Sequence, residues 1–153
     1  MYFQRTRISL VAFLSVTVLY FLPGLSLLGI EVFLVNELRL DIFTILSAFI
    51  LCLGLVSISF YIDLEVGNSL KIKFAGIVIK SINIVDIENI YEVEAEGILA
   101  FLEYLPSIQT VEDGVVISTG SGFVCISTEK ENYYVSCKDA ESICSYFHEI
   151  KNG

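Results

Sequence analysis

The sequence predicts an α-helical membrane hairpin followed by an α+β head of about seven strands and one C-terminal helix. Two charge-free runs predict the hairpin: residues 8–30, with 23 residues, and residues 42–62, with 21. Each is long enough to cross ~30 Å of hydrocarbon as a helix. Beyond the second run, apolar and polar residues alternate, which is typical of strands with one buried face. We therefore expect two domains, a transmembrane hairpin in residues 1–62 and a head in residues 63–153.

The first apolar run resembles the core of a signal peptide, because Arg5 and Arg7 precede it. It is longer than the ~7–15 residues of such a core, and no small-residue cleavage motif follows it. Pro23 lies inside the run, so we expect a kink there that a neighbouring helix covers. Small residues that allow close helix packing occur in both runs: Gly24, Ser26 and Gly29 in the first, and Ser47, Gly54 and Ser57 in the second.

The connection between the two runs, residues 31–41, is short, so we expect a hairpin with both chain ends on one side of the membrane. Two arginines precede the first run, two lysines follow the second, and only Arg39 lies between the runs. Lys and Arg are enriched on the cytoplasmic side of membrane proteins. The sequence therefore predicts an integral protein of the cell membrane with two spans, whose termini and head are cytoplasmic.

The net charge of −9 comes entirely from the head, where six lysines face fifteen acidic residues. A nucleic-acid-binding domain would be basic, so we expect no nucleic-acid partner. Cys52 lies in an apolar run, and the other three cysteines, Cys125, Cys137 and Cys144, lie in the head without close CxxC spacing. We expect free thiols, which fits a reducing cytosol.

The head reads as a series of short antiparallel strands joined by turns. In its first half we expect strands at residues 63–66, 69–74, 77–80, 82–87 and 91–96. In its second half, Gly120-Ser121-Gly122 predicts a hairpin of residues 115–119 and 123–128, and residues 133–136 form a further strand. Asp139 is a predicted N-cap for a helix with an apolar stripe at Ile143, Tyr146, Phe147 and Ile150.

Residues 97–113 interrupt the alternation. Within them, the spacing i, i+3, i+4, i+7 predicts a short amphipathic helix with Ile98, Phe101, Leu102 and Leu105 on one face. Pro106 would end this helix. A segment this apolar is expected to be buried against another surface. That surface is the head itself, the bilayer surface, or a protein partner or second copy of the chain. We interpret these four residues as a partner-binding surface.

The head contains several short packing motifs. They are Asp86–Ile90 before a long strand, Gly114–Ile117 and Gly122–Ile126 around a glycine turn, and Tyr134–Ser136 before Asp139-Ala140-Glu141. In this order they are similar to the bacterial pleckstrin-homology-like (PH-like) domains of small membrane proteins. The resemblance covers about residues 63–150, and the two preceding spans are also similar to membrane-bound members of that group. Ala140 departs from the family, which often has a proline there. The resemblance implies an antiparallel β-barrel capped by the C-terminal helix, an interaction role and no catalytic residue.

Two charged groups are candidate surfaces. Lys71, Lys73 and Lys80 could form a basic rim for anionic lipid headgroups, although each contributes only ~1 kcal/mol. Glu92, Glu94 and Glu96 form an acidic row on one strand face, which could recruit a basic partner or, as a weaker alternative, a divalent cation. Solvated strand faces are the alternative interpretation of both groups.

Residues with catalytic potential are few. His148 is the single histidine, and the sequence contains neither a GxSxG motif nor a P-loop lysine. Cys144 and His148 share a helix face at i, i+4 spacing, and Cys137 is near in sequence, so an enzyme or a thiol or metal sensor is an alternative. We expect no metal, no cofactor and no enzymatic activity.

The sequence therefore favours a non-catalytic, membrane-anchored interaction or scaffold module, which binds a protein partner or a second copy of itself at the cytoplasmic membrane surface. Anchoring makes a weak contact sufficient, because it raises the effective concentration of the head. Two further alternatives stay open. One is an accessory subunit of a membrane transporter, contacted through Pro23-Gly24, and the other is a weak lipid-headgroup sensor.

Overall fold

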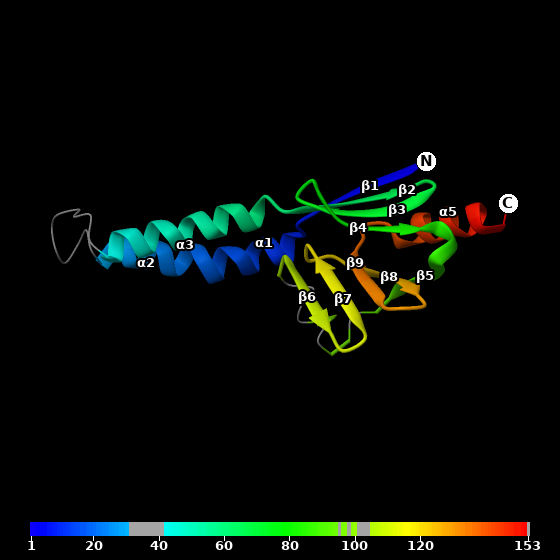
Figure 1. The fold of residues 1–153 in the computed structure, drawn as a ribbon. Helices are drawn as coiled ribbons and strands as arrows, with labels where there is room; N and C mark the ends of the chain where they lie inside the picture. Colours follow the sequence, from blue (N-terminus) through cyan, green and yellow to red (C-terminus); the bar gives the residue numbers. More distant parts are fainter. Residues whose placement is uncertain (31–41, 95, 98, 101–104, 153) are drawn as a thin grey trace. The chain divides into compact units, whose positions relative to one another are not determined.

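The computed structural model describes residues 1–30, 42–94, 96–97, 99–100 and 105–152 (Figure 1). The chain forms two compact units. The helical unit is Phe13–Ser59, and the head combines Met1–Ala12 with Phe60–Gly153. The division therefore assigns the first twelve residues to the head, whereas the sequence predicts them to belong to the membrane hairpin.

The first apolar run folds into a helix with an irregular middle. Helix α1 (Leu10–Val16) continues through a π-helical segment, η1 (Thr17–Phe21), into α2 (Leu22–Ile30). Pro23 has no N–H, and its ring would clash with the carbonyl of Leu19 in a regular α-helix. The wider π-helical segment ends at Phe21, two residues before this proline. The irregularity expected near Pro23 is therefore a local widening of the helix.

Helix α3 (Ile42–Ile58) packs against α2 through small residues. A Cβ atom on Gly24 would lie 2.8 Å from Leu51 Cδ2, and one on Gly54 would lie 2.8 Å from Phe21 Cε2. The Ser47 hydroxyl donates a hydrogen bond of 2.6 Å to the Gly24 carbonyl. The predicted close packing is thus confirmed at these small residues. No such contact is seen at the other three: no atom of the described residues lies within 4 Å of a Cβ on Gly29, and the Ser26 and Ser57 hydroxyls bond to their own helices.

Among the described residues, one helix is long and apolar enough to cross a membrane. Leu10–Ile30 has 21 residues and a mean hydropathy of 2.1. Helix α3 has 17 residues, fewer than the ~20 of a typical span. It ends before the predicted run does, because the chain enters a strand at Tyr61. Residues 31–41 lie outside the described residues, so the structure establishes neither the second span nor the hairpin.

Sheet A contains four antiparallel strands in the order β1-β2-β3-β4. They are β1 (Tyr2–Arg7), β2 (Tyr61–Val66), β3 (Ser69–Phe74) and β4 (Ile77–Asn83). Strands β2 and β3 match the alternation in the sequence. Strand β4 begins as predicted but continues to Asn83, so the separate strand predicted at residues 82–87 is wrong: the chain there divides between the end of β4 and a short 3-10 helix, Ile84–Asp86. Strand β1 was not predicted, and it pairs with β2 in the register Tyr2↔Val66 to Arg7↔Tyr61. Strand β1, which precedes the first apolar helix, therefore belongs to the same sheet as the three strands that follow the second apolar helix.

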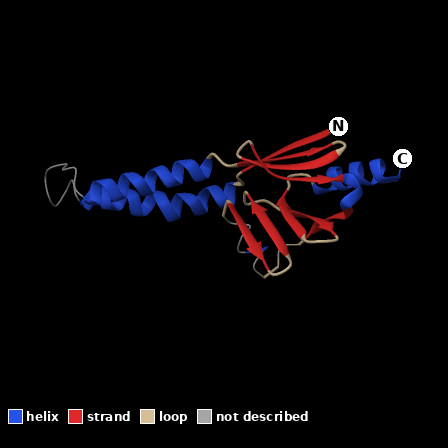
Figure 2. Cartoon of the chain, viewed as in Figure 1, coloured by secondary structure: helices blue, strands red, loops and turns tan. Residues whose placement is uncertain are grey.

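Sheet B contains five strands in the order β5-β8-β9-β7-β6, and the short 3-10 helix η3 (Ile84–Asp86) leads into it (Figure 2). Its strands are β5 (Ile87–Val93), β6 (Ser107–Val111), β7 (Gly114–Ser118), β8 (Phe123–Thr128) and β9 (Asn132–Ser136). The predicted hairpin of residues 115–119 and 123–128 is wrong, because β9 lies between β7 and β8. Gly114 permits the parallel β7–β9 contact, since a Cβ there would lie 1.9 Å from the Asn132 carbonyl oxygen.

The described strands form two open sheets, so the expected closed barrel is wrong. Two additional strands, β1 in sheet A and β6 in sheet B, extend the sheets instead of closing them. The coarser expectation, an α+β head with a C-terminal helix, is confirmed. Both sheets and α5 (Ala140–Asn152) contribute to one core, which contains Leu64, Ile72, Ile90, Val124 and Phe147 among others.

Asp139 caps α5, as predicted. Its carboxylate accepts hydrogen bonds from the Ser142 hydroxyl, at 2.6 Å, and from the Ser142 backbone N–H, at 3.0 Å. These two bonds lower the pKa of the Asp139 carboxyl below its ordinary value. The capped helix then places Ile143 and Phe147, both fully buried, on the core.

Candidate functional site

The end of sheet A at which the chain leaves and re-enters the head is its most distinctive surface. Strand β1 ends at Arg7, directly opposite Tyr61, where β2 begins. The Ala75 N–H donates a hydrogen bond of 2.9 Å to the Tyr61 carbonyl, which places the β3–β4 turn at the same end. Apolar helix begins only three residues after Arg7, at Leu10. We call this part of the head the exit end.

Three consecutive apolar side chains are exposed beside the exit end. Ile77, Val78 and Ile79 of β4 are 69%, 50% and 41% exposed. Strand β4 is an edge strand, and a bulge near Val78 interrupts its pairing with β3. A bulge changes the alternation of faces, so neighbouring side chains do not all reach the core. A run of exposed apolar residues on an edge strand fits contact with an apolar surface.

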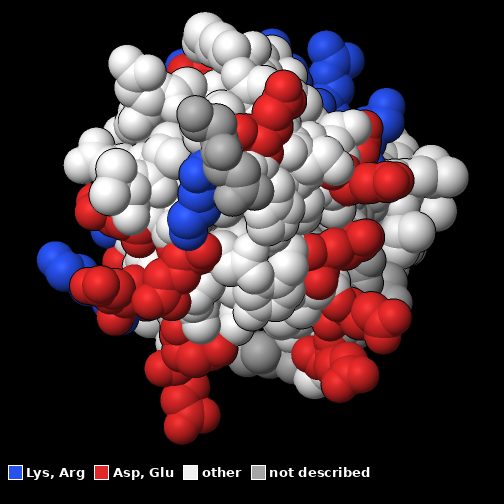
Figure 3. Space-filling model, turned by 90° about the vertical axis from the view of Figure 1, so that its right-hand side faces the viewer, with Lys and Arg blue, Asp and Glu red and all other residues white. Residues whose placement is uncertain are grey.

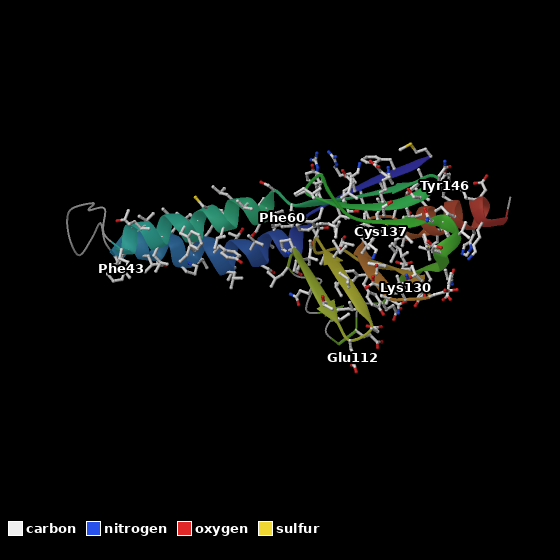
Figure 4. The ribbon with its side chains drawn as sticks, viewed as in Figure 1. Phe43, Phe60, Glu112, Lys130, Cys137 and Tyr146 are labelled. Atoms are coloured by element: carbon white, nitrogen blue, oxygen red, sulfur yellow. The ribbon has the colours of Figure 1, made fainter. Side chains whose placement is uncertain are left out.

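Aromatic residues lie at the same end. The rings of Phe60, labelled in Figure 4, and Phe74 are 4.8 Å apart, and the Arg5 guanidinium lies 4.4 Å from the centre of the Tyr61 ring. Aromatic side chains are enriched where membrane proteins meet the headgroup region. The composition of the exit end is therefore typical of a surface close to a bilayer.

Arg5 also forms a bidentate ion pair with Asp63. The two bonds measure 2.7 Å from Nε to Oδ1 and 2.8 Å from Nη2 to Oδ2, and the Asp63 side chain is only 5% exposed. The hydrogen bond to Asp63 raises the pKa of Arg5 further above its ordinary value. The pair joins two neighbouring strands through two charge-assisted hydrogen bonds.

The structure separates the three lysines predicted to form a basic rim. Lys71 and Lys73 lie two residues apart on β3, and Lys73 pairs with Glu65. Lys80 is opposite Ile72, a core residue, so it projects from the other face of the sheet. Their lipid-facing role stays a prediction.

Lys80 belongs instead to a surface cavity of about 530 Å³. Its ammonium group lies 3.1 Å from Glu131 and 5.0 Å from the centre of the Tyr133 ring. The Tyr133 hydroxyl donates to Glu131, and this bond and the bond from Lys80 lower the pKa of Glu131. Lys151, across the cavity, donates to backbone carbonyls of β5. These charged groups are therefore engaged with one another or with the backbone.

The predicted acidic row is exposed but extends beyond its strand. Glu92 lies on β5, which ends at Val93, and Glu94 and Glu96 follow it. All three are exposed, and one whole face of the molecule carries many acidic and few basic side chains (Figure 3). The acidic character of the head is thus a property of a surface broader than this row.

The predicted partner segment is only partly described. Ile98, Phe101 and Leu102 lie outside the described residues. Leu105 is half-buried, and Leu99 packs against Val116 and Phe123 in a small cluster on sheet B. At least one apolar residue of the segment is therefore covered by the head itself.

The cysteines of the head show the features of protonated thiols. Burial raises the pKa of Cys137 to about 11, and burial also raises the pKa values of Cys125 and Cys144. Among the described residues, no three His, Cys, Asp or Glu side chains come close enough to hold a metal ion. The described part of the head therefore contains no preformed metal site, and its three thiols are not activated.

Sequence reasoning missed the exit end, because β1 was read only as the basic flank of an apolar run. Its inward residues, Tyr2, Gln4 and Thr6, are mostly polar, so they give little apolar periodicity. The signal that could have found it is the alternation of these residues with exposed Phe3, Arg5 and Arg7.

No family model matches the chain, nor does any curated protein or solved structure. The resemblance to bacterial PH-like membrane proteins therefore stays a prediction that rests on the motifs of this sequence.

Proposed function

We propose that this chain is a non-catalytic, membrane-anchored interaction module, whose two apolar helices hold an α+β head at the cytoplasmic surface of a membrane. There the head binds a protein partner or a second copy of the chain. The observation that carries this proposal is the pairing of Arg7 with Tyr61, which holds the two ends of the apolar segment side by side.

This pairing supports two spans rather than one. A segment that crosses the membrane once has its ends separated by ~30 Å of hydrocarbon. Arg7 and Tyr61 are neighbours in one sheet, so the residues between them have to cross an even number of times or not at all. Helix α3 covers about 26 Å at 1.5 Å per residue, which suffices for a span if flanking aromatic residues lie in the headgroup region.

The side of the membrane follows from the distribution of basic residues. Arg5, Arg7, Lys71 and Lys73 flank the apolar segment on the head side, whereas Arg39 alone belongs to the connection between the two helices. This bias supports a cytoplasmic head.

The interaction surface combines two apolar features. One is the exposed run Ile77–Ile79, and the other is the segment 98–105 of the sequence. Confinement to a thin layer makes weak contacts through such surfaces sufficient. The protonated thiols and the internally paired charges of the cavity at Lys80 favour binding over catalysis.

Crosslinking in native membranes, followed by mass spectrometry, tests the interaction role. Crosslinks from the head to one recurrent protein, or between copies of the chain, are expected. The double substitution Phe101→Glu and Leu105→Glu should remove them, whereas Tyr91→Glu, at an exposed site on β5, should not. Crosslinks that persist in the double variant would contradict this assignment of the surface.

Membrane residence is tested separately by alkaline carbonate extraction and by protease protection. The chain should stay in the membrane pellet, and the head should be digested only when the cytoplasmic face is accessible. Release of the chain by carbonate would exclude the anchored arrangement.

A further inference from the structure

A second cavity, of about 560 Å³, lies at the exit end. It is lined by Arg5, Thr6, Arg7, Ile8, Ser9, Ser121 and Lys138, all of which belong to the head. The Ser9 N–H donates a hydrogen bond of 3.2 Å to the Thr119 carbonyl. This bond ties the chain beyond β1 to the loop between β7 and β8, and Ser9 and Ser121 from these two segments both line the cavity.

The cavity is locally basic within an acidic head. Arg5 is neutralised by Asp63, but Arg7 and Lys138 are exposed and have no acidic side chain within ion-pair distance among the described residues. Two positive charges thus converge where the rest of the head carries a large excess of negative charge.

Buried hydroxyls without hydrogen-bond partners line or adjoin the same cavity. Thr6 is 2% exposed, and its Oγ1 has no hydrogen-bond partner among the described residues. The hydroxyl oxygens of Thr119 and Ser121 are also buried and lack a partner in that part of the chain, although Ser121 as a whole is half-buried. Ser136, by contrast, accepts a hydrogen bond from the Thr119 N–H and donates to the Ser121 carbonyl. Burying a hydroxyl without a partner costs free energy, so unpaired hydroxyls beside a basic cavity indicate a ligand that accepts hydrogen bonds.

We propose that this cavity binds a phosphate group. Arg7 and Lys138 supply the charge, and the hydroxyls of Thr6 and Ser121, which are covered in the ligand-free chain, turn to donate hydrogen bonds to phosphate oxygens. The group belongs to a phospholipid headgroup or to a soluble phosphate. The lipid source rests on the proposed function, because Ser9 directly precedes the first apolar helix and the cavity then lies at the depth of the headgroups.

Native mass spectrometry of the detergent-purified full chain, with added phosphatidylglycerol, tests the lipid source. The wild-type chain should retain one such lipid. The double variant Arg7→Gln and Lys138→Gln should bind it roughly tenfold more weakly, because two charge-assisted hydrogen bonds are lost. The matched control Lys130→Gln and Lys151→Gln removes the same charge from exposed positions outside the cavity and should bind like the wild type.

The soluble source is tested with inorganic phosphate, measured as a rise in the thermal midpoint of the detergent-purified chain. A rise that the Arg7 and Lys138 substitutions abolish, without retention of the lipid, assigns the site to a soluble phosphate group. Absence of both effects, or equal loss in the control variant, overturns the proposal.

Thr6→Val separates a binding role from a structural one. Valine keeps the shape of threonine and removes the unpartnered hydroxyl, so the ligand-free chain should unfold at the same midpoint or higher. Binding of whichever probe the wild type retains should nevertheless weaken several-fold. Unchanged binding would contradict the role of Thr6. A chain that carbonate releases but that still binds phosphate would refute the anchored arrangement and leave this site standing.

Discussion

Arg5 and Asp63 form a bidentate ion pair that joins the strand before the first apolar helix to the strand after the second. The carboxylate is almost fully buried, whereas the guanidinium is partly exposed and lies on the Tyr61 ring. The pair therefore fixes β1 to β2 at the point where the chain leaves and re-enters the head.

Substitution of Arg5 by Gln should lower the midpoint of thermal unfolding of the head by several degrees. The change leaves the buried Asp63 carboxylate without its cationic partner, and an unpaired buried charge is strongly unfavourable. Near-ultraviolet circular dichroism of the full chain in detergent measures this midpoint. The control is Arg7→Gln on the same face of β1, which should leave the midpoint unchanged; equal effects would show that the ion pair contributes nothing specific.

Gly114→Ala should destabilise the head by about 3 kcal/mol, because the new Cβ would overlap the Asn132 carbonyl and separate β7 from β9. Gly122 is the matched control, since a Cβ there meets no atom within 4 Å. Denaturant unfolding of the two variants makes the comparison. Similar stability of both variants would contradict the parallel β7–β9 pairing.

Gly54→Leu should weaken the packing of the two apolar helices by about 1–3 kcal/mol, because the side chain would displace Phe21 and Tyr20. Gly29→Leu adds the same volume where no atom of the described residues lies within 4 Å of the new Cβ, so it should be neutral. The resistance of the helical unit to unfolding by dodecyl sulfate measures the effect of each of the two substitutions. If the Gly29 variant is the less stable one, the packing described for Gly54 is incorrect.

The Cys137 thiol should react slowly with iodoacetamide in the folded head. With a pKa of about 11, the thiol is almost entirely protonated at pH 8, and only the thiolate reacts. The rate should rise roughly tenfold for each pH unit toward 11, and unfolding at pH 8 should accelerate it at least ~100-fold. Peptide mapping after timed labelling gives the rate at this residue. Rapid labelling of the folded chain at pH 7 would instead support a thiol sensor.

Local patterns in the sequence predicted most of the secondary structure. Period-two alternation identified β2, β3 and β7 to β9 to within two residues, and the Asp139 cap and apolar stripe identified α5. These elements are determined by residues close to one another in the sequence, so the alternation and spacing of apolar residues predict them directly. The alternation located β4 and β5 less well, because β5 begins four residues before the strand predicted at residues 91–96 and the strand predicted at residues 82–87 does not form.

The features that the sequence did not predict depend on contacts with residues far away in the chain. Strand β1 is stabilised by β2, more than fifty residues later, and its own inward face is largely polar. The glycine turn at residues 120–122 suggests a hairpin, but β9 displaces β8 from β7, which no local pattern reports. The exposed Ile77–Ile79 run depends on a bulge and on its position at a sheet edge, and both are tertiary properties.

Formation of a disulfide between residues 7 and 61 tests the central claim most directly. Arg7→Cys and Tyr61→Cys place two thiols at directly opposed positions of β1 and β2. With Cys52 replaced by Ala, mild oxidation of intact membranes should link the two new cysteines within one chain, as shown by mass spectrometry of the joined peptides. Efficient linkage in chains that resist carbonate extraction is the result we predict. Failure to link in such chains, with both thiols accessible to reagent, would place the two ends of the apolar segment apart and contradict the anchored hairpin.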